Sequence, residues 1–381
     1  MYKKIYPPST IGILGGGQLG RMLAQEAKKM GYRVITLDPT LGCPCAQVCD
    51  EQIVAEFSNK TQALKLAKKV DVLTYEFENI PAETVEYLEK HGFSVFPCSK
   101  ALKLTQNRIK EKEFLRSQGI LTADFYAVER TSDLEKAFLE LGLPAVLKTS
   151  TGGYDGKGQV VLKNRKELEN VFSRSSFGPL IWEKFIPFVK EISVICARGK
   201  NGQIKTFPVP ENTHCNNILH MSIVPARIPA EVEKKAANIA KRVAERLGVI
   251  GVIGVEMFLL KDRTILVNEI APRVHNSGHY TIEACYTSQF EQHIRAICGL
   301  PLGSTDLLSP AVMVNILGDG LMCKKDIFSL IDGVLKIAGV NLHLYGKNEI
   351  RPGRKMGHIT VLAKSVSDAI RKAGIALKSS S

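Results

Sequence analysis

The sequence predicts a protein of mixed α/β and α+β class, in which a parallel sheet is followed by antiparallel hairpins and a small C-terminal unit. Three observations support this prediction. Strand and helix patterns alternate over residues 1–100, short hairpin-like strands follow from residue 145, and two apolar runs at 252–258 and 265–267 flank a turn. A chain of 381 residues is also long for one hydrophobic core, so roughly two or three domains are expected.

The N-terminal part carries the parallel-sheet pattern. Strands are expected at residues 10–14, 32–37, 70–75 and 94–96. A helix is expected over residues 18–30, where apolar side chains recur at helical spacing, and Gly31 suits its C-terminal cap. A second helix opens at Pro81, because proline is accepted at the first helical position. Such alternation is typical of parallel strands that are joined by helices.

The rest of the chain has a different pattern. A helix over residues 99–117 leads to short strands at 145–149, 159–162, 180–185, 191–197 and 205–209. Two further helices are expected at 230–247, ending at Gly248, and at 281–298. Residues 301–310 are expected to be a linker, and the remainder a small mixed unit. We therefore expect three domains, at residues 1–100, 101–300 and 301–381.

Composition favours a globular protein that works on small anionic ligands. The hydrophobic and charged contents are 45% and 23%, and no apolar run approaches the roughly 20 residues that span a bilayer. No signal-peptide pattern precedes the first strand, so a cytoplasmic location is expected. The net charge of +13 is spread over several helices without a long basic block, which favours small phosphorylated ligands over nucleic acid or a membrane surface.

The cysteines do not indicate a disulfide framework, because there are nine of them without regular spacing. Cys43, Cys45 and Cys49 form a cluster, but the fourth ligand and the usual two-residue gap of a zinc site are missing. We expect reduced, partly buried thiols at these positions.

The strongest chemical signal is a pair of glutamates in neighbouring apolar strands. Glu256 lies in the run 252–258, and Glu269 follows the run 265–267. The residues between the runs are typical of a hairpin turn, which would bring the two carboxylates side by side. Adjacent buried carboxylates repel each other unless a cation lies between them, and hard oxygen ligands favour Mg²⁺. The pair therefore predicts a magnesium site.

A glycine turn at residues 15–20 has glycine at the first, third and sixth positions of a dinucleotide fingerprint. Asp38 closes the next strand about twenty residues later, where a ribose-binding acid would lie. Alone, this pattern predicts a dehydrogenase. No hydride-transfer site follows it, however, and a glycine turn before a helix suits any anion or close packing.

A second glycine-rich segment, residues 149–159, lies between two strands and lacks the ending of a P-loop. Lys148 precedes it and Lys157 lies near its end, so the loop is suited to cover a polyphosphate. Residues 182–186 combine a polar start with apolar side chains, as an adenine slot requires. Glu191 is placed a few residues later to accept hydrogen bonds from ribose hydroxyls.

The order of these motifs resembles the ATP-grasp superfamily. Within it, the chain is similar to the N5-carboxyaminoimidazole ribonucleotide synthetase family of purine biosynthesis. The motifs that carry the resemblance are residues 15–23, 105–108, 151–159, 271–279 and 351–358. The resemblance implies a Rossmann-like preATP-grasp sheet, a central ATP-grasp domain with ATP between its two halves, a small C-terminal domain and a homodimer.

The resemblance also assigns residues to sites. The nucleotide would be bound by Arg108, Lys148, Gly153, Tyr154, Asp155, Gly156, Lys157, Gly158, Gln159, Glu183, Lys184, Phe185, Ile186, Glu191, His214, Asn268 and Glu269. Bicarbonate and the ribonucleotide would be bound by Gln18, Glu76, Tyr154, Asp155, Arg273, His275, Asn276, Lys347, Arg354 and Lys355. The catalytic residues would be Arg273, His275 and Lys148, and the ligands of Mg²⁺ would be Glu256 and Glu269.

The implied reaction is a carbon–nitrogen ligation with ATP, bicarbonate and 5-aminoimidazole ribonucleotide as substrates. Bicarbonate is phosphorylated to carboxyphosphate, and the carboxyl group passes to the 5-amino nitrogen. Three alternatives remain: a formate-dependent glycinamide ribonucleotide transformylase or another ATP-grasp ligase, an oxidoreductase that uses residues 15–20, and a basic nucleic-acid-binding module. The patterns at Tyr154-Asp155 and at residues 273–276 favour the carboxylating enzyme.

Overall fold

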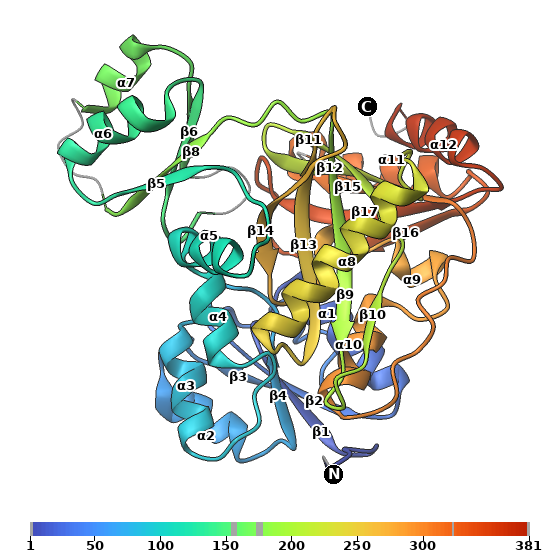
Figure 1. Cartoon of the computed structure of the whole chain (residues 1–381). Helices are drawn as coiled ribbons and strands as arrows, with labels where there is room; N and C mark the ends of the chain where they lie inside the picture. Colours follow the sequence, from blue (N-terminus) through green and yellow to red (C-terminus); the bar gives the residue numbers. More distant parts are fainter. Residues whose placement is uncertain (1–2, 154–157, 173–177, 322–323, 379–381) are drawn as a thin grey trace.

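The computed structural model describes residues 3–153, 158–172, 178–321 and 324–378. Three sheets organise this part of the chain (Figure 1). One four-stranded sheet lies near the N-terminus, another forms a projecting lobe, and a nine-stranded sheet occupies the centre. Within the described ranges, no helix combines the length and apolar character that a membrane crossing requires.

The N-terminal sheet is parallel, in the order β3-β2-β1-β4. Its strands are β1 (Thr10–Leu14), β2 (Arg33–Asp38), β3 (Glu51–Val54) and β4 (Val72–Tyr75). Helix α1 (Gln18–Lys29) packs on one face, and α2 (Lys60–Ala67) and α3 (Ala82–Lys90) pack on the other. The predicted parallel sheet is confirmed. The strand expected at 94–96 is reduced to one bridge between Leu73 and Val95, and Pro81 caps α3 instead of opening it.

The single helix expected over residues 99–117 is wrong, because the chain forms α4 (Ser99–Thr105) and α5 (Arg108–Ser117) instead. Asn107 lies between them, and its side-chain oxygen accepts from the amides of Ile109 and Lys110 at the start of α5. The break places Arg108 at the first turn of α5, where its amide donates to Ser150 O at 2.8 Å. The second helix thereby supports the start of the glycine-rich loop.

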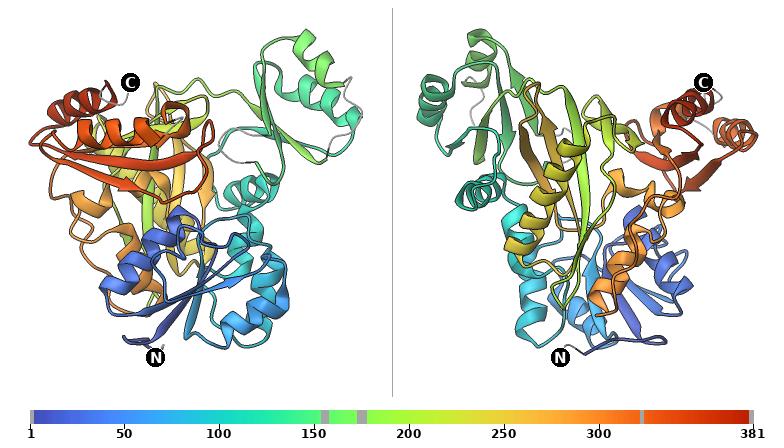
Figure 2. Two further views of the ribbon diagram at one scale, coloured as in Figure 1. Left: turned by 180° about the vertical axis from the view of Figure 1, so that it is seen from behind. Right: turned by 45° about the vertical axis from the view of Figure 1, so that its right-hand side comes forward.

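The projecting lobe is an antiparallel sheet in the order β5-β8-β6-β7. Its elements are β5 (Phe125–Val128), α6 (Thr131–Leu141), β6 (Ala145–Thr149), β7 (Gln159–Leu162), α7 (Arg165–Phe172) and β8 (Leu180–Lys184). Trp182 is fully buried in the core of this lobe, together with Leu134 and Leu147. Both views in Figure 2 show the lobe standing apart from the body, which agrees with its separate core.

The central sheet is antiparallel, in the order β14-β13-β9-β11-β12-β15-β17-β16, with β10 paired to β9. Its first part comprises β9 (Lys190–Arg198), β10 (Ile204–Thr206), β11 (Glu211–Cys215), β12 (Ile218–Val224), β13 (Gly251–Leu259) and β14 (Ile265–Ala271). Helix α8 (Ala230–Leu247) crosses one face of this part (Figure 1), and Val232, Ala236 and Val243 pack on it. Gly248 ends α8 in the left-handed conformation, as predicted.

The C-terminal unit extends the central sheet instead of forming a sheet of its own. β12 pairs with β15 (Ala311–Leu317), which continues through β17 (Lys355–Leu362) to β16 (Val340–Leu344). A short turn η2 (Gly318–Gly320) and helices α11 (Lys324–Val334) and α12 (Val366–Lys378) complete the unit. The basic turn at 351–355 is therefore attached to the same sheet as the Glu256 hairpin.

The helix expected over residues 281–298 is also interrupted. After the short turn η1 (Asn276–Gly278), α9 (Thr281–Ala284) ends at Cys285, which has an extended backbone and bridges to Leu307. Ser288 then caps α10 (Gln289–Ile297) by accepting from the amide of Glu291. Helix α10 packs against α1, β9 and β13, so it fixes the N-terminal sheet against the central sheet.

Candidate active site

The two predicted glutamates face each other. Strands β13 and β14 pair antiparallel, and Glu256 lies directly opposite Glu269 in their register. The predicted hairpin is confirmed, with a β-bulge between Glu256 and Met257. Directly opposite residues project from the same face of a sheet at close range, so the two carboxylates share one site.

The electrostatics of the pair favour a bound cation. Burial alone would raise the pKa of Glu256, but the hydrogen bond and charge of His275, with smaller effects of His214 and Lys355, lower it to about 2. Burial raises the pKa of Glu269, and the negative charge of Glu256 adds to this rise. A further positive charge between the two carboxylates would relieve this repulsion.

An additional oxygen donor lies beside the pair. Asn268 Oδ1 is buried without a hydrogen-bond partner and is adjacent to Glu269 in the chain. Buried polar atoms without partners are rare, and a carbonyl-type oxygen is a ligand that hard cations accept. The residues present therefore fit a divalent cation that prefers oxygen ligands.

The His275 ring has a polar partner at each of its two nitrogens. Its Nε2 lies 3.1 Å from Glu256 Oε1, and its Nδ1 lies 2.9 Å from Ser277 Oγ. The chain of contacts continues from Ser277 Oγ to Ser193 Oγ at 2.7 Å, and Asn212 Nδ2 donates to Ser193 Oγ at 2.9 Å. Ser277, Ser193 and Asn212 are all buried, so this chain of hydrogen bonds fixes the orientation of the imidazole ring.

The backbone around His275 is fixed as well. The His275 amide donates to Gln289 Oε1 at 2.8 Å, and Gln289 Nε2 donates back to His275 O at 2.7 Å. A Cβ atom at Gly254 would lie only 2.7 Å from His275 Cβ. Only glycine at that position of β13 therefore allows the imidazole to pack beside Glu256.

Two expected nucleotide-binding cations, Arg108 and Lys148, lie where the lobe meets the body. The Arg108 guanidinium donates to Thr149 O at 3.1 Å and to Gly153 O at 3.0 Å. Lys148 Nζ lies 2.9 Å from Glu183 Oε2. The charges of both cations act on Glu269 and oppose the rise of its pKa. Positive charge thus faces the carboxylate pair, as phosphoryl transfer requires.

Sequence reasoning missed Lys112, a lysine of α5 that is only 1% exposed. Its ammonium lies 3.5 Å from Glu183 Oε1 and donates to Thr122 Oγ1 at 3.0 Å. Burial would raise the pKa of Glu183, but Lys112 and then Lys148 lower it. Glu183 is therefore an anion between two cations, and it orients the Lys148 ammonium.

Glu111 was missed too, although it is a third carboxyl group near the paired glutamates. It is 2% exposed and accepts from the amide of Ile270 at 3.1 Å. Burial, followed by the charge of Glu269, raises the pKa of Glu111 well above its usual value. A signal was available, because residues three and four positions after Arg108 share its face of the helix.

The expected adenine and ribose residues lie at the end of β8 and on β9 and β11. Glu183 is buried, whereas Phe185 is 38% exposed and Ile186 is partly buried. Glu191 and His214, which are far apart in sequence, form a hydrogen-bonded ion pair across the neighbouring strands. Burial would lower the pKa of His214, but the bond to Glu191 raises it above its usual value.

Arg273 already has a carboxylate partner in the N-terminal domain. It forms an ion pair with Glu78, from the loop after β4, and its NH1 donates to Val274 O at 3.0 Å. Burial would raise the pKa of Glu78, but the charge and hydrogen bond of Arg273 lower it to about 2. The pair ties the N-terminal sheet to the end of β14, beside the paired glutamates.

The glycine turn at residues 15–20 holds the protein's own carboxylates. Glu76 accepts from two amides of the turn, including that of Gly20 at 2.7 Å, and Asp38 accepts from the amide of Gly16 at 2.8 Å. Glu76 and Asp38 are only 6% and 8% exposed. The amides that would bind a dinucleotide pyrophosphate are therefore occupied, which argues against the oxidoreductase alternative.

The charges of Lys347 and Lys355 in the C-terminal unit act on two different carboxylates. Lys347 Nζ donates to Lys355 O at 2.7 Å, and its charge opposes the rise in the pKa of Glu76 that burial causes. The charge of Lys355 acts on Glu256 instead. Arg354 NH1 donates to Glu349 O at 2.9 Å, just before the basic turn, and it also lies near the Glu349 carboxylate. The C-terminal unit thus reaches both the glycine turn and the paired glutamates.

Two further expected substrate residues lie near these groups. Gln18 lies within the glycine turn, is the first residue of α1, and is partly buried. Asn276 lies in η1, and both polar atoms of its side chain are buried without a hydrogen-bond partner. Because burying an unpaired amide is unfavourable, Asn276 indicates a place for a polar ligand.

Part of the predicted loop lies outside the described residues. These positions are Tyr154, Asp155, Gly156 and Lys157. The flanking positions are described: Gly153 accepts from Arg108, Gly158 has a positive φ of +77°, and Gln159 pairs with Lys148 across β6 and β7.

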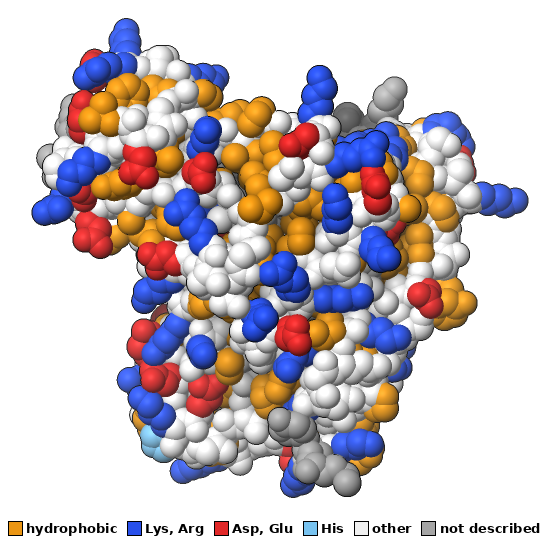
Figure 3. Space-filling view, viewed as in Figure 1, with side chains coloured by type: hydrophobic (Ala, Val, Ile, Leu, Met, Phe, Trp, Pro, Cys, Tyr) orange, Lys and Arg blue, Asp and Glu red, His pale blue; other side chains and the backbone are white. Residues whose placement is uncertain are grey.

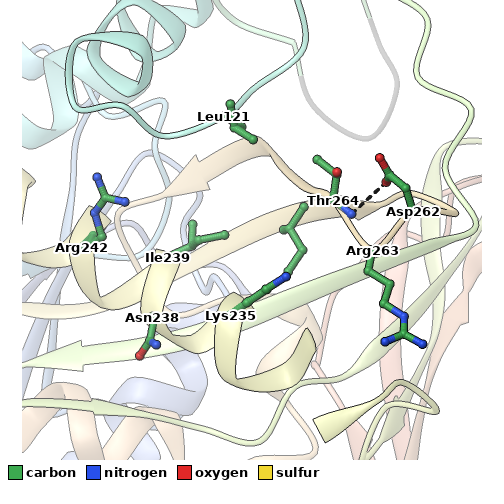
Figure 4. A pocket seen from close by; sticks show the side chains of 9 residues that line it. Leu121, Lys235, Asn238, Ile239, Arg242, Asp262, Arg263 and Thr264 are labelled. Carbon is green, nitrogen blue, oxygen red and sulfur yellow. Dashed lines mark hydrogen bonds between the residues drawn. The ribbon is translucent and has the colours of Figure 1, made fainter. Parts of the chain in front are cut away.

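A cavity of about 410 Å³ lies away from these groups, between α8 and the β13–β14 turn (Figure 4). It is lined by Leu121, Lys235, Asn238, Ile239, Arg242, Asp262, Arg263, Thr264 and Ile265. None of these residues has a buried polar atom without a partner, and Asp262 accepts from the amide of Thr264 at 2.9 Å. The cavity therefore lacks the convergent chemistry found around Glu256.

Figure 3 shows Lys and Arg scattered among acidic side chains on the visible face, without one basic patch.

Comparisons with known proteins agree with this geometry. Three family models match successive parts of the chain: a ribonucleotide synthetase preATP-grasp domain at residues 9–106, an ATP-grasp domain at 113–290 and a phosphoribosylaminoimidazole carboxylase C-terminal domain at 311–372. The N5-carboxyaminoimidazole ribonucleotide synthase of Bacillus subtilis is 48% identical over 368 residues, which cover 97% of this chain and 95% of the relative.

Solved structures show the same similarity. The N5-carboxyaminoimidazole synthetase of Staphylococcus aureus in complex with ADP has a TM-score of 0.91 and 42% identity, and 98% of each chain is covered. An N5-carboxyaminoimidazole synthase of Aspergillus clavatus, in complex with ADP and 5-aminoimidazole ribonucleotide, has a TM-score of 0.92 and 32% identity, and 99% of each chain is covered.

Proposed function

The chain belongs to the family of N5-carboxyaminoimidazole ribonucleotide synthases, and from this premise we propose that it carboxylates 5-aminoimidazole ribonucleotide with ATP and bicarbonate. The products would be N5-carboxyaminoimidazole ribonucleotide, ADP and phosphate, in de novo purine biosynthesis. The observation that carries the proposal is the facing pair Glu256 and Glu269, with the charges of Arg108 and Lys148 acting on Glu269 and with His275 paired to Glu256.

Glu256 and Glu269 are the proposed ligands of Mg²⁺, and Asn268 offers a further oxygen. The bound ion would supply positive charge to the phosphate oxygens. The chain prepares this site, because His275 keeps Glu256 ionised and the Glu111 carboxyl group holds the backbone of β14. These contacts fix the carboxylates before any ligand arrives.

ATP is proposed to lie between the lobe and the paired glutamates. Arg108 and Lys148 supply positive charge to its phosphates, and Glu183 orients the lysine. Glu191, paired with His214, is proposed to accept from the ribose hydroxyls. The remaining proposed contacts are Gly153, Tyr154, Asp155, Gly156, Lys157, Gly158, Gln159, Lys184, Phe185, Ile186, Asn268 and Glu269.

In the first half-reaction, a bicarbonate oxygen attacks the γ-phosphorus in line, and the bond to the leaving ADP oxygen breaks. Bicarbonate is a poor electrophile, and the product carboxyphosphate is an activated form of it. Lys148 is proposed to offset the charge that develops on the transferring group. Arg273, oriented by Glu78, and His275 are proposed to hold the bicarbonate.

In the second half-reaction, the 5-amino nitrogen attacks the carbonyl carbon of carboxyphosphate. The carbon–oxygen bond to phosphate breaks, and the nitrogen loses a proton, which gives the carbamate. Asn276 is the residue best suited to read a polar group of the ribonucleotide, because its amide has no partner in the protein. The other proposed contacts are Gln18, Glu76, Tyr154, Asp155, Lys347, Arg354 and Lys355.

We also propose that the three functional units are residues 1–100, 101–300 and 301–381, and that the enzyme is a cytoplasmic homodimer. The family matches at 9–106, 113–290 and 311–372 support this division. The C-terminal strands and the strands of the paired glutamates belong to one sheet, whereas the lobe has a sheet of its own. We therefore propose that the C-terminal unit moves with the paired glutamates and not with the lobe.

The experiment that tests the proposed function measures ADP release with two substrate pairs. Bicarbonate with 5-aminoimidazole ribonucleotide should support turnover in the presence of Mg²⁺, and formate with glycinamide ribonucleotide should not. Glu269→Gln, which keeps the shape but removes one ligand charge, should lower turnover about 100-fold. Glu113→Gln, on the exposed side of α5, is the matched control and should behave as the wild type. Turnover with only the formate pair, or full activity of Glu269→Gln, would overturn the proposal.

A further inference from the structure

We propose that Cys45 and Cys49 form a redox-sensitive modification site, at which hydrogen peroxide joins the two thiols in a disulfide that weakens binding of the ribonucleotide. The bond itself does not depend on the proposed function. Its effect on binding does, because the residues affected are those proposed to bind the ribonucleotide.

The two thiols lie on one turn of the chain beside the glycine turn. The amides of Val48 and Cys49 both lie 3.0 Å from Cys45 O, so residues 45–49 form a single helical turn. The Cys49 thiol donates to Glu51 O at 3.2 Å, and a hydrogen bond between the Cys45 and Cys49 side chains shifts the pKa of both thiols. Cys45 is fully buried, whereas Cys49 is partly exposed. A small oxidant can therefore reach the Cys49 sulfur, and the buried Cys45 sulfur lies next to it.

The pair divides into an attacking thiolate and a protonated partner. The hydrogen bond from Cys45, which outweighs the effect of burial, lowers the pKa of Cys49 to about 7. The same hydrogen bond, followed by burial, raises the pKa of Cys45 well above its usual value. The thiolate is the form that reacts with peroxide. Among the described residues, no group of three His, Cys, Asp or Glu is arranged to hold a metal ion, so these thiols are not committed to one.

The chemistry balances in two steps. The Cys49 thiolate attacks one oxygen of hydrogen peroxide, the oxygen–oxygen bond breaks, and a sulfenic acid and hydroxide form, the latter taking up a proton as water. The Cys45 sulfur then attacks the Cys49 sulfur, water leaves, and the disulfide forms. Two thiols are oxidised by two electrons while one peroxide is reduced to two molecules of water.

Closing this bond must move the turn. Cβ atoms four residues apart on a helical turn are about 5–6 Å apart, whereas a disulfide requires about 3.5–4.5 Å. Residues 45–49 must therefore tighten by roughly 1–2 Å. The Cys45 amide donates to Gly16 O at 2.9 Å, and the Cys43 sulfur packs against Gly16, where an added Cβ would lie 2.1 Å away. The glycine turn is thus in direct contact with residues 45–49 and would be displaced when they tighten.

The same turn is also linked to the C-terminal unit. Arg21 donates to Pro44 O at 3.1 Å and to Gln47 Oε1 at 2.8 Å, and Gln47 Nε2 donates to Gly346 O at 2.7 Å. Gly346 directly precedes Lys347, whose charge reaches Glu76. A shift of the turn therefore moves groups on both sides of the proposed ribonucleotide site, which includes Gln18, Glu76 and Lys347.

In the test, the full-length enzyme is treated with hydrogen peroxide and its remaining thiols are alkylated. The tryptic peptide of residues 34–60, which contains Cys43, Cys45 and Cys49, is then analysed by mass spectrometry. We expect a loss of two hydrogens, an alkylated Cys43 and no backbone fragments between Cys45 and Cys49. The KM for the ribonucleotide should rise several-fold, the KM for ATP should stay nearly unchanged, and dithiothreitol should restore both. Cys49→Ser should abolish the bond and the shift in KM.

Controls separate the possible outcomes. Cys215→Ser, at an exposed cysteine of β11, should respond to peroxide as the wild type does. In Cys45→Ser, Cys49 should be trapped as a sulfenic acid that reacts with dimedone. Peroxide-treated wild type in which Cys45 and Cys49 are both alkylated would overturn the proposal, as would a disulfide without any change in ribonucleotide KM. An untreated enzyme without turnover would refute the proposed function alone, because the peptide masses do not depend on activity.

Discussion

The glycine turn at residues 15–20 and the glycine-rich loop that begins at Thr149 look alike in sequence but meet opposite charges in the structure. The first turn directs its amides at Glu76 and Asp38, which are buried. The second loop begins beside Arg108 and Lys148, whose charges act on Glu269. In the first region the protein supplies its own anion, whereas in the second it supplies cations.

The difference shows what a glycine pattern encodes. The first turn needs glycine because other groups approach its backbone closely, whereas Gly152 of the second loop has a positive φ of 76°, and the sequence pattern alone does not distinguish these two causes. In the first turn a Cβ on Gly20 would lie 2.7 Å from a backbone oxygen, so the turn is closed by packing. Among the described residues, nothing lies within 4 Å of a Cβ added to Gly152, although one added to Gly158 would lie 2.8 Å from Thr149 Oγ1, so the loop is open near its start. A glycine-rich loop with flanking cations therefore indicates a nucleotide-binding site more strongly than a glycine turn whose amides are already bound by carboxylates.

The largest effect is expected at the open loop. Lys148→Ala should lower kcat/KM for ATP about 100- to 1,000-fold, because it removes a positive charge aimed at the transferring phosphate. Steady-state kinetics with saturating bicarbonate and ribonucleotide would measure it. Lys163→Ala, at an exposed lysine that follows β7, is the matched control. If Lys148→Ala had the same kcat/KM for ATP as the wild type, the cations beside the second loop would not serve nucleotide binding or phosphoryl transfer.

The next effect concerns the ion pair between Glu78 and Arg273, which joins the two regions. The usual pKa of this carboxyl group is 4.5, and in the folded protein it is about 2. A depressed pKa contributes stability above pH 4.5, and this contribution is lost as the pH falls towards 2. The contribution is up to about 3 kcal/mol. Urea unfolding should show that Glu78→Gln is less stable than the wild type at pH 7 and that the difference shrinks by pH 3.

Exposed Glu56→Gln is the control for this measurement and should follow the wild type at every pH. A constant difference between Glu78→Gln and the wild type across pH 3–7 would show that the pair does not link the N-terminal sheet to β14 through charge.

The smallest effect is expected at the closed turn. Glu76→Gln replaces one accepting oxygen with a donor, so a buried amide of the turn loses its partner. The free energy of unfolding should fall by about 2 kcal/mol, and the affinity for ATP, measured by calorimetry, should be retained. Loss of ATP affinity with unchanged stability would place the nucleotide at residues 15–20 and reverse the comparison.

The Glu256 hairpin could be predicted because its signals are local. Strand alternation and a short turn determine which residues face each other, and both lie within twenty positions of sequence. The cations beside the open loop were predictable for the same reason, since Lys148 adjoins it. The parallel N-terminal sheet followed from its alternating pattern.

The remainder depended on contacts between distant parts of the chain. Glu76 reaches the glycine turn from 56 residues away along the chain, and no local pattern indicates it. Lys112 and Glu111 look like surface charges on a helix, and only the fold buries them against Glu183 and Glu269. The two helix breaks were missed because the capping residues Asn107 and Ser288 lie within patterns that otherwise continue.

The most direct test of the central claim follows an oxygen atom from bicarbonate to phosphate. The enzyme is supplied with ATP, 5-aminoimidazole ribonucleotide and bicarbonate that carries oxygen-18, and the released phosphate is analysed by mass spectrometry. If the site around Glu256 and Glu269 lets ATP phosphorylate bicarbonate, each phosphate should contain one labelled oxygen, because the attacking oxygen stays with phosphorus. Phosphate that contains no label from bicarbonate would contradict the account.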